Sequence, residues 1–124
     1  MKRPLLTVVA IATLFSAGCE SSSESSGPGP VSAALLSPNG NEGSAVLDVV
    51  GPVESVSTPS GVIAYTTPSA NGLRVVLVRL EAGALSMILN VPDVSTPPSV
   101  SVVEVAGPDD KVRQSLAGYR VEVE

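Results

Sequence analysis

Side chains that could do chemistry are few in this chain, and the most distinctive of them is a lone cysteine. Cys19 stands in "LFSAGCES", residues 14–21, where an apolar run gives way to serines. The chain contains no histidine, so the usual general base is missing, and the other reactive groups are carboxylates, lysine, serines and tyrosines. We therefore expect no catalytic residues, and the sequence indicates that the protein is not an enzyme.

Oxygen ligands for a cation are present but do not follow a known spacing. Asp48, Asp93, Asp109 and Asp110 carry carboxylates of the kind that calcium prefers. They lack the spacing of an EF-hand, and paired aspartates after "GP" are typical of a turn. The sequence also has no glycine-rich phosphate loop, no GxSxG and no Cys/His cluster for zinc. We expect no metal and no cofactor, and calcium binding by these aspartates stays open as an alternative.

The elements that must position any site are β-strands. From Val31 onward, short valine-rich runs alternate with turn clusters rich in proline and glycine, at a spacing that suits strands and not helices. This pattern predicts an all-β fold, a single small antiparallel β-sandwich of about seven or eight strands. The expected strands are residues 31–36, 44–50, 53–57, 61–66, 73–80, 84–91, 99–106 and 117–123.

Alternation and turn chemistry predict which side chains face inward and how some strands connect. In residues 84–91 and 118–124 the odd-numbered side chains are apolar, and polar side chains stand mostly between them. Residues 81–83 form a three-residue link ending in Gly83, which predicts a hairpin with a G1 bulge between the fifth and sixth strands. A shift of phase between Val102 and Val103 predicts a bulge in the seventh strand.

The fifth strand, "LRVVLVRL" at 73–80, is apolar on both faces except for Arg74 and Arg79, which lie on opposite faces by parity. One interpretation is a central strand whose outward valines are tolerated for their β-propensity. The other is that Arg74, Val76 and Val78 belong to an interaction surface, together with the neighbouring strand 84–91. The sequence leaves both interpretations open.

The amino terminus has the order of an export signal. Lys2 and Arg3 precede an apolar run, 5–15, that is far shorter than the roughly 18 to 20 residues needed to span a bilayer. The small residues 16–18 then lead into Cys19, and this stretch resembles the lipobox of bacterial lipoproteins, although Ser16 stands where leucine is usual. The resemblance implies a signal peptide at 1–18, cleavage before Cys19, and a lipid-modified cysteine carrying acyl chains such as palmitate.

Residues 19–30 follow as the lipid anchor and a tether rich in serine, glycine and proline, which cannot bury enough apolar surface to order itself. Residues 31–124 form the predicted domain. In lipoproteins of many Gram-negative bacteria, a residue other than aspartate after the cysteine goes with release to the outer membrane, and here that residue is Glu20. We therefore expect an extracytoplasmic, membrane-anchored protein and, if the source is Gram-negative, one at the outer membrane or cell surface rather than the inner membrane.

Charge argues against a nucleic-acid partner. Cleavage before Cys19 removes Lys2 and Arg3, which leaves five basic side chains against twelve acidic ones. A negatively charged domain repels phosphate backbones, and no basic cluster recruits it to anionic lipid. The lipid on Cys19 is the expected contact with the membrane.

The predicted domain is similar in strand count and turn spacing to the immunoglobulin-like and cohesin-like β-sandwiches of bacterial surface proteins. Cohesin-like modules bind protein partners across a sheet face, which implies a partner for the surface around Arg74, Val76 and Val78. We expect a non-enzymatic domain that binds another envelope or surface protein or has a structural role in the cell envelope. The alternative is a lipoprotein that captures a small molecule, glycan or ion beside the membrane.

Overall fold

Eight β-strands and no helix make up residues 26–124, the part of the chain that this computed structural model describes. The predictions for residues 1–25 lie outside it. The all-β prediction is confirmed, and each predicted strand overlaps one strand of the structure. The strands are β1 (Gly29–Leu36), β2 (Glu42–Val50), β3 (Ser55–Ser57), β4 (Val62–Ser69), β5 (Gly72–Gly83), β6 (Ser86–Val91), β7 (Ser99–Ala106) and β8 (Arg120–Val123).

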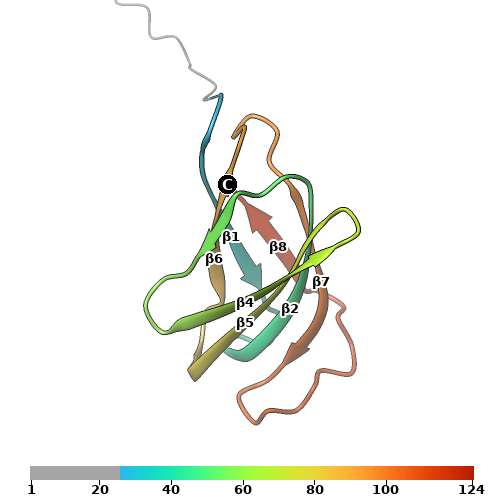
Figure 1. Cartoon of the computed structure of the whole chain (residues 1–124). Coiled ribbons are helices and arrows are strands. Elements are labelled where there is room, and N and C mark those ends of the chain that lie inside the picture. Colours follow the sequence, from blue (N-terminus) through green and yellow to red (C-terminus); the bar gives the residue numbers. More distant parts are fainter. Residues whose placement is uncertain (1–25) are drawn as a thin grey trace, which may run out of the picture.

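Two antiparallel sheets of four strands pack face to face as a β-sandwich (Figure 1). The first, which we call the β1 sheet, has the strand order β3-β6-β1-β8. The second, the β5 sheet, has the order β4-β5-β2-β7. Only β4 and β5 are neighbours both in the chain and in a sheet, so most connections cross between the sheets.

The core lies between the sheets and consists of small and medium aliphatic side chains. Strands form here because valine, which is abundant in this chain, fits a pleated and half-buried surface. The predicted alternation in residues 84–91 is confirmed, since the side chains of its odd-numbered residues are all buried. The buried apolar residues are Val31, Ala33, Ala45, Leu47, Val49, Val62, Val75, Leu77, Leu85, Met87, Leu89, Val91 and Val105.

The hairpin predicted at residues 81–83 is wrong. β5 continues to Gly83, which pairs with Glu42 of β2, and β6 belongs to the other sheet. Both edges of β5 are already paired, one with β4 and one with β2, so no edge is left for β6. The chain therefore leaves one sheet and enters the other between residues 83 and 86. Arg79 holds this crossing, because its guanidinium donates to the carbonyl oxygens of Glu81 at 2.9 Å and Ala84 at 2.8 Å.

The bulge predicted in the seventh strand is confirmed. Along β7, Glu104 pairs with Val46 and Val102 pairs with Leu47, so Val103 has no partner in β2.

The start of β5 lies very close to β2. A Cβ on Gly72 would be 2.0 Å from the carbonyl oxygen of Val49. Only glycine allows β2 and β5 to approach this closely.

The first strand begins at Gly29, two residues before the predicted start. Just before it, Gly27 is fixed to the loop after β6, since its N–H donates to Asp93 Oδ1 at 3.2 Å and its carbonyl accepts from Val94 N–H at 2.9 Å. The last residues of the predicted tether are therefore attached to the sandwich. None of the described residues forms a helix that would be long and apolar enough to cross a membrane.

Candidate functional site

The predicted interaction residues lie in one row on the outer face of the β5 sheet. β5 is a central strand, as one interpretation of its sequence predicts, and Val75 and Leu77 on its inner face are completely buried. Arg74, Val76 and Val78 alternate with them and therefore point away from the core. Arg74 is exposed, whereas the two valines are half-buried by their neighbours in the sheet.

Apolar side chains on both neighbouring strands extend this row into a patch. The strand register places Tyr65 of β4 and Val46 of β2 on either side of Val76, and it places Ile63 of β4 beside Val78. Tyr65 is 62% exposed and Ile63 is 44% exposed. We call this set the outer apolar patch: Val46, Ile63, Tyr65, Val76 and Val78.

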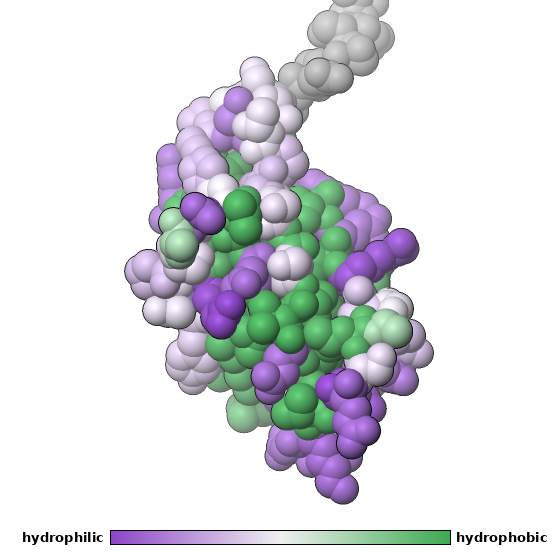
Figure 2. All heavy atoms as spheres, turned by 90° about the vertical axis from the view of Figure 1, so that its right-hand side faces the viewer, coloured by the Kyte–Doolittle hydropathy of each residue, from purple (hydrophilic) through white to green (hydrophobic). Residues whose placement is uncertain are grey.

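Further apolar side chains are exposed on the strands of this sheet. Figure 2 looks at the side where β2 and β7 lie in Figure 1, and it shows apolar side chains gathered into a continuous area with polar side chains around it. Val50 and the bulged Val103 are also exposed on this sheet, and Leu80 beyond Val78 is 89% exposed. Exposed apolar areas of this kind mark contact surfaces more often than isolated exposed side chains do.

An ion pair borders the patch on β5 and β2. Arg74 Nε donates to Asp48 Oδ1 at 2.8 Å, and Arg74 Nη2 donates to Asp48 Oδ2 at 3.0 Å. These hydrogen bonds from Arg74 lower the pKa of Asp48 and raise that of Arg74. Arg74 is therefore not a free cation on the predicted surface, and Asp48 is not a free calcium ligand.

The strand expected to adjoin this surface does not. Residues 84–91 were predicted to lie beside β5, but β6 lies in the β1 sheet, on the other side of the core. The neighbours of β5 are β4 and β2. The prediction is therefore wrong for residues 84–91, because the hairpin expected to join them to β5 does not form. The row formed by Arg74, Val76 and Val78 does lie on one outer face.

The outer face of the β1 sheet differs in chemistry from that of the β5 sheet. Its exposed positions are mainly serines and charged side chains. Ile88 is the large apolar residue that is exposed there, and its register partners are Ser32 and Ser57. The two outer faces therefore allow a direct comparison of an apolar and a polar surface on one molecule.

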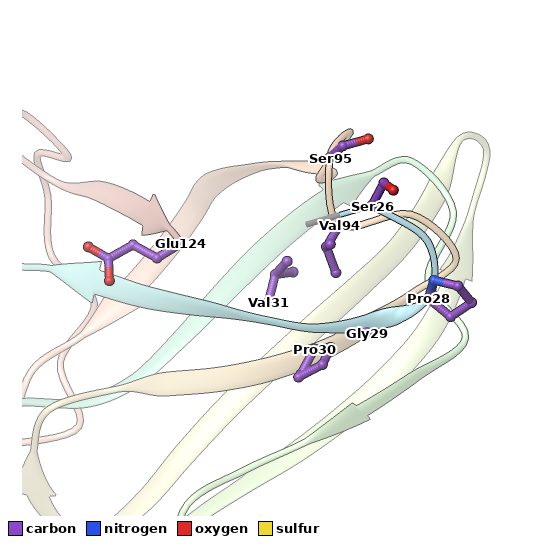
Figure 3. A pocket seen from close by; sticks show the side chains of 8 residues that line it. All are labelled: Ser26, Pro28, Gly29, Pro30, Val31, Val94, Ser95 and Glu124. Atoms are coloured by element: carbon purple, nitrogen blue, oxygen red, sulfur yellow. The ribbon is translucent and has the colours of Figure 1, made fainter. Parts of the chain in front are cut away.

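The surface of the sandwich has two hollows of note. A small one of about 330 Å³ lies where β4 begins and β5 runs past it, lined by Gly61, Val62, Ile63, Arg79, Leu80 and Glu81. A larger and open groove of about 670 Å³ lies beside the start of β1, lined by Ser26, Pro28, Gly29, Pro30, Val31, Val94, Ser95 and Glu124. Figure 3 shows Pro28 at one end of this groove and Glu124 at the other, with Val31 between them. The smaller hollow adjoins the outer apolar patch through Ile63.

A buried carboxylate, which the sequence did not reveal, lies at the start of β2. Glu42 is only 1% exposed, and Arg113 donates to its Oε1 from Nη2 at 2.6 Å and from Nε at 3.2 Å. The hydroxyl of Tyr119 and that of Ser37 donate to its Oε2. Asn39 Nδ2 in turn donates to the Tyr119 hydroxyl at 2.8 Å.

The surroundings of Glu42 keep it ionised. Burial raises the pKa of its carboxyl, but the hydrogen bonds from Arg113, Tyr119 and Ser37 together with the charge of Arg113 outweigh this effect and lower it. A carboxylate with a lowered pKa and occupied oxygens is a poor base, and the contacts of Glu42 join the start of β2 to the segment between β7 and β8. The expected strand began at residue 44 and did not include Glu42, and a register shift between Glu42 and Ser44 turns this side chain inward.

The remaining candidate calcium ligands lie in two separate turns, Asp93 in one and Asp109 with Asp110 in the other. Asp93 Oδ1 accepts hydrogen bonds from the Ser95 hydroxyl at 2.7 Å and from the backbone N–H of Ser95 at 3.0 Å, and these bonds lower the pKa of Asp93. Asp109 accepts from the N–H of Lys111, and Asp110 has a positive φ of 63°. Within residues 26–124, no three acidic, histidine or cysteine side chains lie close enough to hold a metal ion.

Comparison with protein-family models, with curated proteins and with solved structures finds no match to this chain. The class that the structure defines is therefore an architectural one, a small antiparallel β-sandwich of two four-stranded sheets. Likeness to immunoglobulin-like or cohesin-like modules remains a prediction. Cys19, the predicted lipidation site, lies outside the described residues.

Proposed function

We propose that this chain is an extracytoplasmic lipoprotein, anchored in a membrane through lipid on Cys19, whose β-sandwich binds another envelope or surface protein without catalysing a reaction. A structural contact within the cell envelope is included in this proposal. The observation that carries it is the outer apolar patch on the β5 sheet.

The contrast between the two sheets supports protein binding at this patch. An outward valine on a sheet is tolerated by itself, but here Val76 and Val78 lie beside Ile63 and Tyr65 on the next strand. On the β1 sheet, the corresponding positions are mainly polar, so exposure of apolar side chains is not a general property of this protein. An apolar sheet face bordered by the ion pair of Arg74 and Asp48 suits a protein surface better than a small polar ligand.

Anchoring by Cys19 would keep this face close to the membrane. Among residues 26–124, Gly27 is the first with hydrogen bonds to the sandwich, and seven residues separate it from Cys19. Even a fully extended chain of that length reaches only about 30 Å. Partners in the same membrane, or in the adjoining layer of the envelope, are therefore within reach of the patch.

The test is chemical cross-linking on intact cells, followed by capture of the full chain and identification of attached proteins. We expect a reproducible protein partner that is lost with Val76→Lys and Val78→Lys in combination. Ile88→Lys is the control on the other sheet, since it also places a lysine at an exposed aliphatic position, and it should leave the partner attached. Melting curves would confirm that all variants stay folded.

Two results would contradict the proposal. One is a partner that stays attached to the Val76→Lys, Val78→Lys variant. The other is recovery of bulk lipid and cell-wall material alone, in which case capture of a small ligand or glycan, with the groove beside β1 as the first place to look, would become the better hypothesis.

A further inference from the structure

The edge of the β5 sheet at β4 carries backbone groups without partners in the described part of the chain. Val62 N–H donates to the Pro59 carbonyl at 3.2 Å, and the Val62 carbonyl accepts from Thr58 Oγ1 at 2.7 Å. These partners precede β4, so the peptide groups of Val62 point away from β5. The N–H and carbonyl groups of successive residues in a strand point to opposite edges. Those of Ala64 and Thr66 therefore point to the same outer edge as those of Val62.

The other edges are protected. Val112 and Arg113 cover the last two residues of β7, with a hydrogen bond of 2.7 Å from Arg113 N–H to the Val105 carbonyl, and the rest of that strand carries the bulge at Val103 and the charge of Glu104. β3 is only three residues long, and β8 carries Arg120 and Glu122. Short strands, charges and covering segments are the usual devices that prevent edge pairing.

β4 lacks these devices over most of its length. Its eight residues, VIAYTTPS, include no charged side chain, and Pro68 blocks only one position near its end. In Figure 1 the strand lies along the outside of its sheet. An uncovered, neutral edge of this length favours pairing with a further strand.

We propose that β4 pairs antiparallel with β4 of a second copy of this chain, on a two-fold axis through Tyr65, so that the two β5 sheets form one eight-stranded sheet. In this register Ala64 lies opposite Thr66 of the partner subunit. Each such pair exchanges two hydrogen bonds, and symmetry provides two pairs.

The free groups of β4 match this register. The next pair outward would join Val62 to Pro68 of the partner subunit. Val62 already has partners for its N–H and its carbonyl, and proline has no N–H to donate. The residues that need hydrogen bonds are therefore those that the register pairs with each other, which favours a second copy over an unrelated strand.

Side chains on the outer face agree with the same arrangement. Tyr65 would lie beside Tyr65 of the partner subunit, and aromatic pairs across strands are stabilising. No like charges would meet, since β4 is neutral. The contact uses the strand edge and one member of the outer apolar patch, Tyr65, whereas Val46, Val76 and Val78 lie on β2 and β5 and take no part in it.

The test is disulfide trapping in the full chain, in membranes. On the two-fold axis, the Cα atoms of residue 65 would be about 4.5 Å apart, within the range of a disulfide. Tyr65→Cys should therefore give a covalent dimer on mild oxidation. The unaltered chain measures any background from Cys19, and Ile88→Cys controls for random collisions.

A backbone variant makes the test specific. Added to Tyr65→Cys, Thr66→Pro removes an N–H that points to the free edge and spares the bonds to β5, and it should lower the dimer yield at least about tenfold. Thr66→Val keeps that N–H and should leave the yield unchanged. Equal yields with proline and valine, no dimer above background, or a disulfide to a different protein would each overturn the proposal.

A second measurement guards against a proline variant that fails to fold. Sedimentation of the unaltered full chain in detergent should give a mass that rises from monomer to dimer with protein concentration. A monomer at every concentration would overturn the proposal without any variant.

Discussion

Glu42 is the one charged residue that is buried in the described part of the chain, and its contacts explain why it is tolerated there. Each of its oxygens accepts hydrogen bonds, and Arg113 supplies the opposite charge. The partners come from distant parts of the sequence, since Arg113 and Tyr119 lie in the long connection between β7 and β8. This carboxylate therefore fixes that connection to the start of β2.

Replacing Glu42 by alanine should destabilise the protein by about 2 kcal/mol, because Arg113 and Tyr119 lose an acceptor in a largely buried place. The free energy of unfolding from urea titration would measure this loss. Glu104→Ala, at an exposed position of β7, is the matched control and should change the free energy little. Equal values for the two variants would contradict the role given to Glu42.

β5 explains the connections of the whole sandwich at the scale of elements. Its apolar residues on both faces suit a strand with the core on one side and the outer apolar patch on the other. Because β4 and β2 occupy its two edges, the chain has to leave the sheet after Gly83. Arg79 stabilises that exit through the carbonyl oxygens of Glu81 and Ala84.

Arg79→Met should therefore destabilise the crossing by about 1 kcal/mol, since methionine keeps an unbranched stem and loses both hydrogen bonds. The loss should be visible as a lower urea midpoint with an unchanged slope. Arg120→Met, an exposed arginine on β8, serves as the comparison and should have a smaller effect. A larger loss from Arg120→Met would show that the guanidinium of Arg79 is not what holds the crossing.

Acidic pH should destabilise the molecule as a whole. The pKa values of Glu42, Asp48 and Asp93 are lowered in the folded chain by hydrogen bonds from Arg113, Arg74 and Ser95 respectively. Carboxyls with lowered folded-state values bind protons more readily when the chain unfolds. Their contribution to stability is complete above the ordinary values, 4.5 for glutamate and 3.8 for aspartate, and is lost as the pH falls through the lowered ones.

We therefore expect the urea midpoint to be steady from about pH 7 to pH 5 and to fall below about pH 4.5. Glu42→Gln should reduce the size of this fall, because its share of the proton uptake is removed. A midpoint that is the same at neutral pH and at about pH 3 would contradict the expectation.

The sequence by itself determined where the strands lie and which side chains face inward. Strand positions follow from local properties, namely runs of valine between proline and glycine turns, and inward faces follow from alternation with period two. The bulge at Val103 and the central place of β5 were predictable for the same reason, since a break in alternation or an apolar run on both faces is visible within a few residues.

Only the tertiary structure decided which strands are neighbours, and the candidate site depends on that. Gly83 favours a hairpin locally, but the hairpin fails because both edges of β5 are occupied by strands distant in sequence. Glu42 is buried because a register shift turns it toward Arg113, seventy-one residues away. The central row of the site, Val76 and Val78, could be predicted from the local sequence. Its neighbours Tyr65 and Ile63, and the pairing of Arg74 with Asp48, depend on the register between strands and could not.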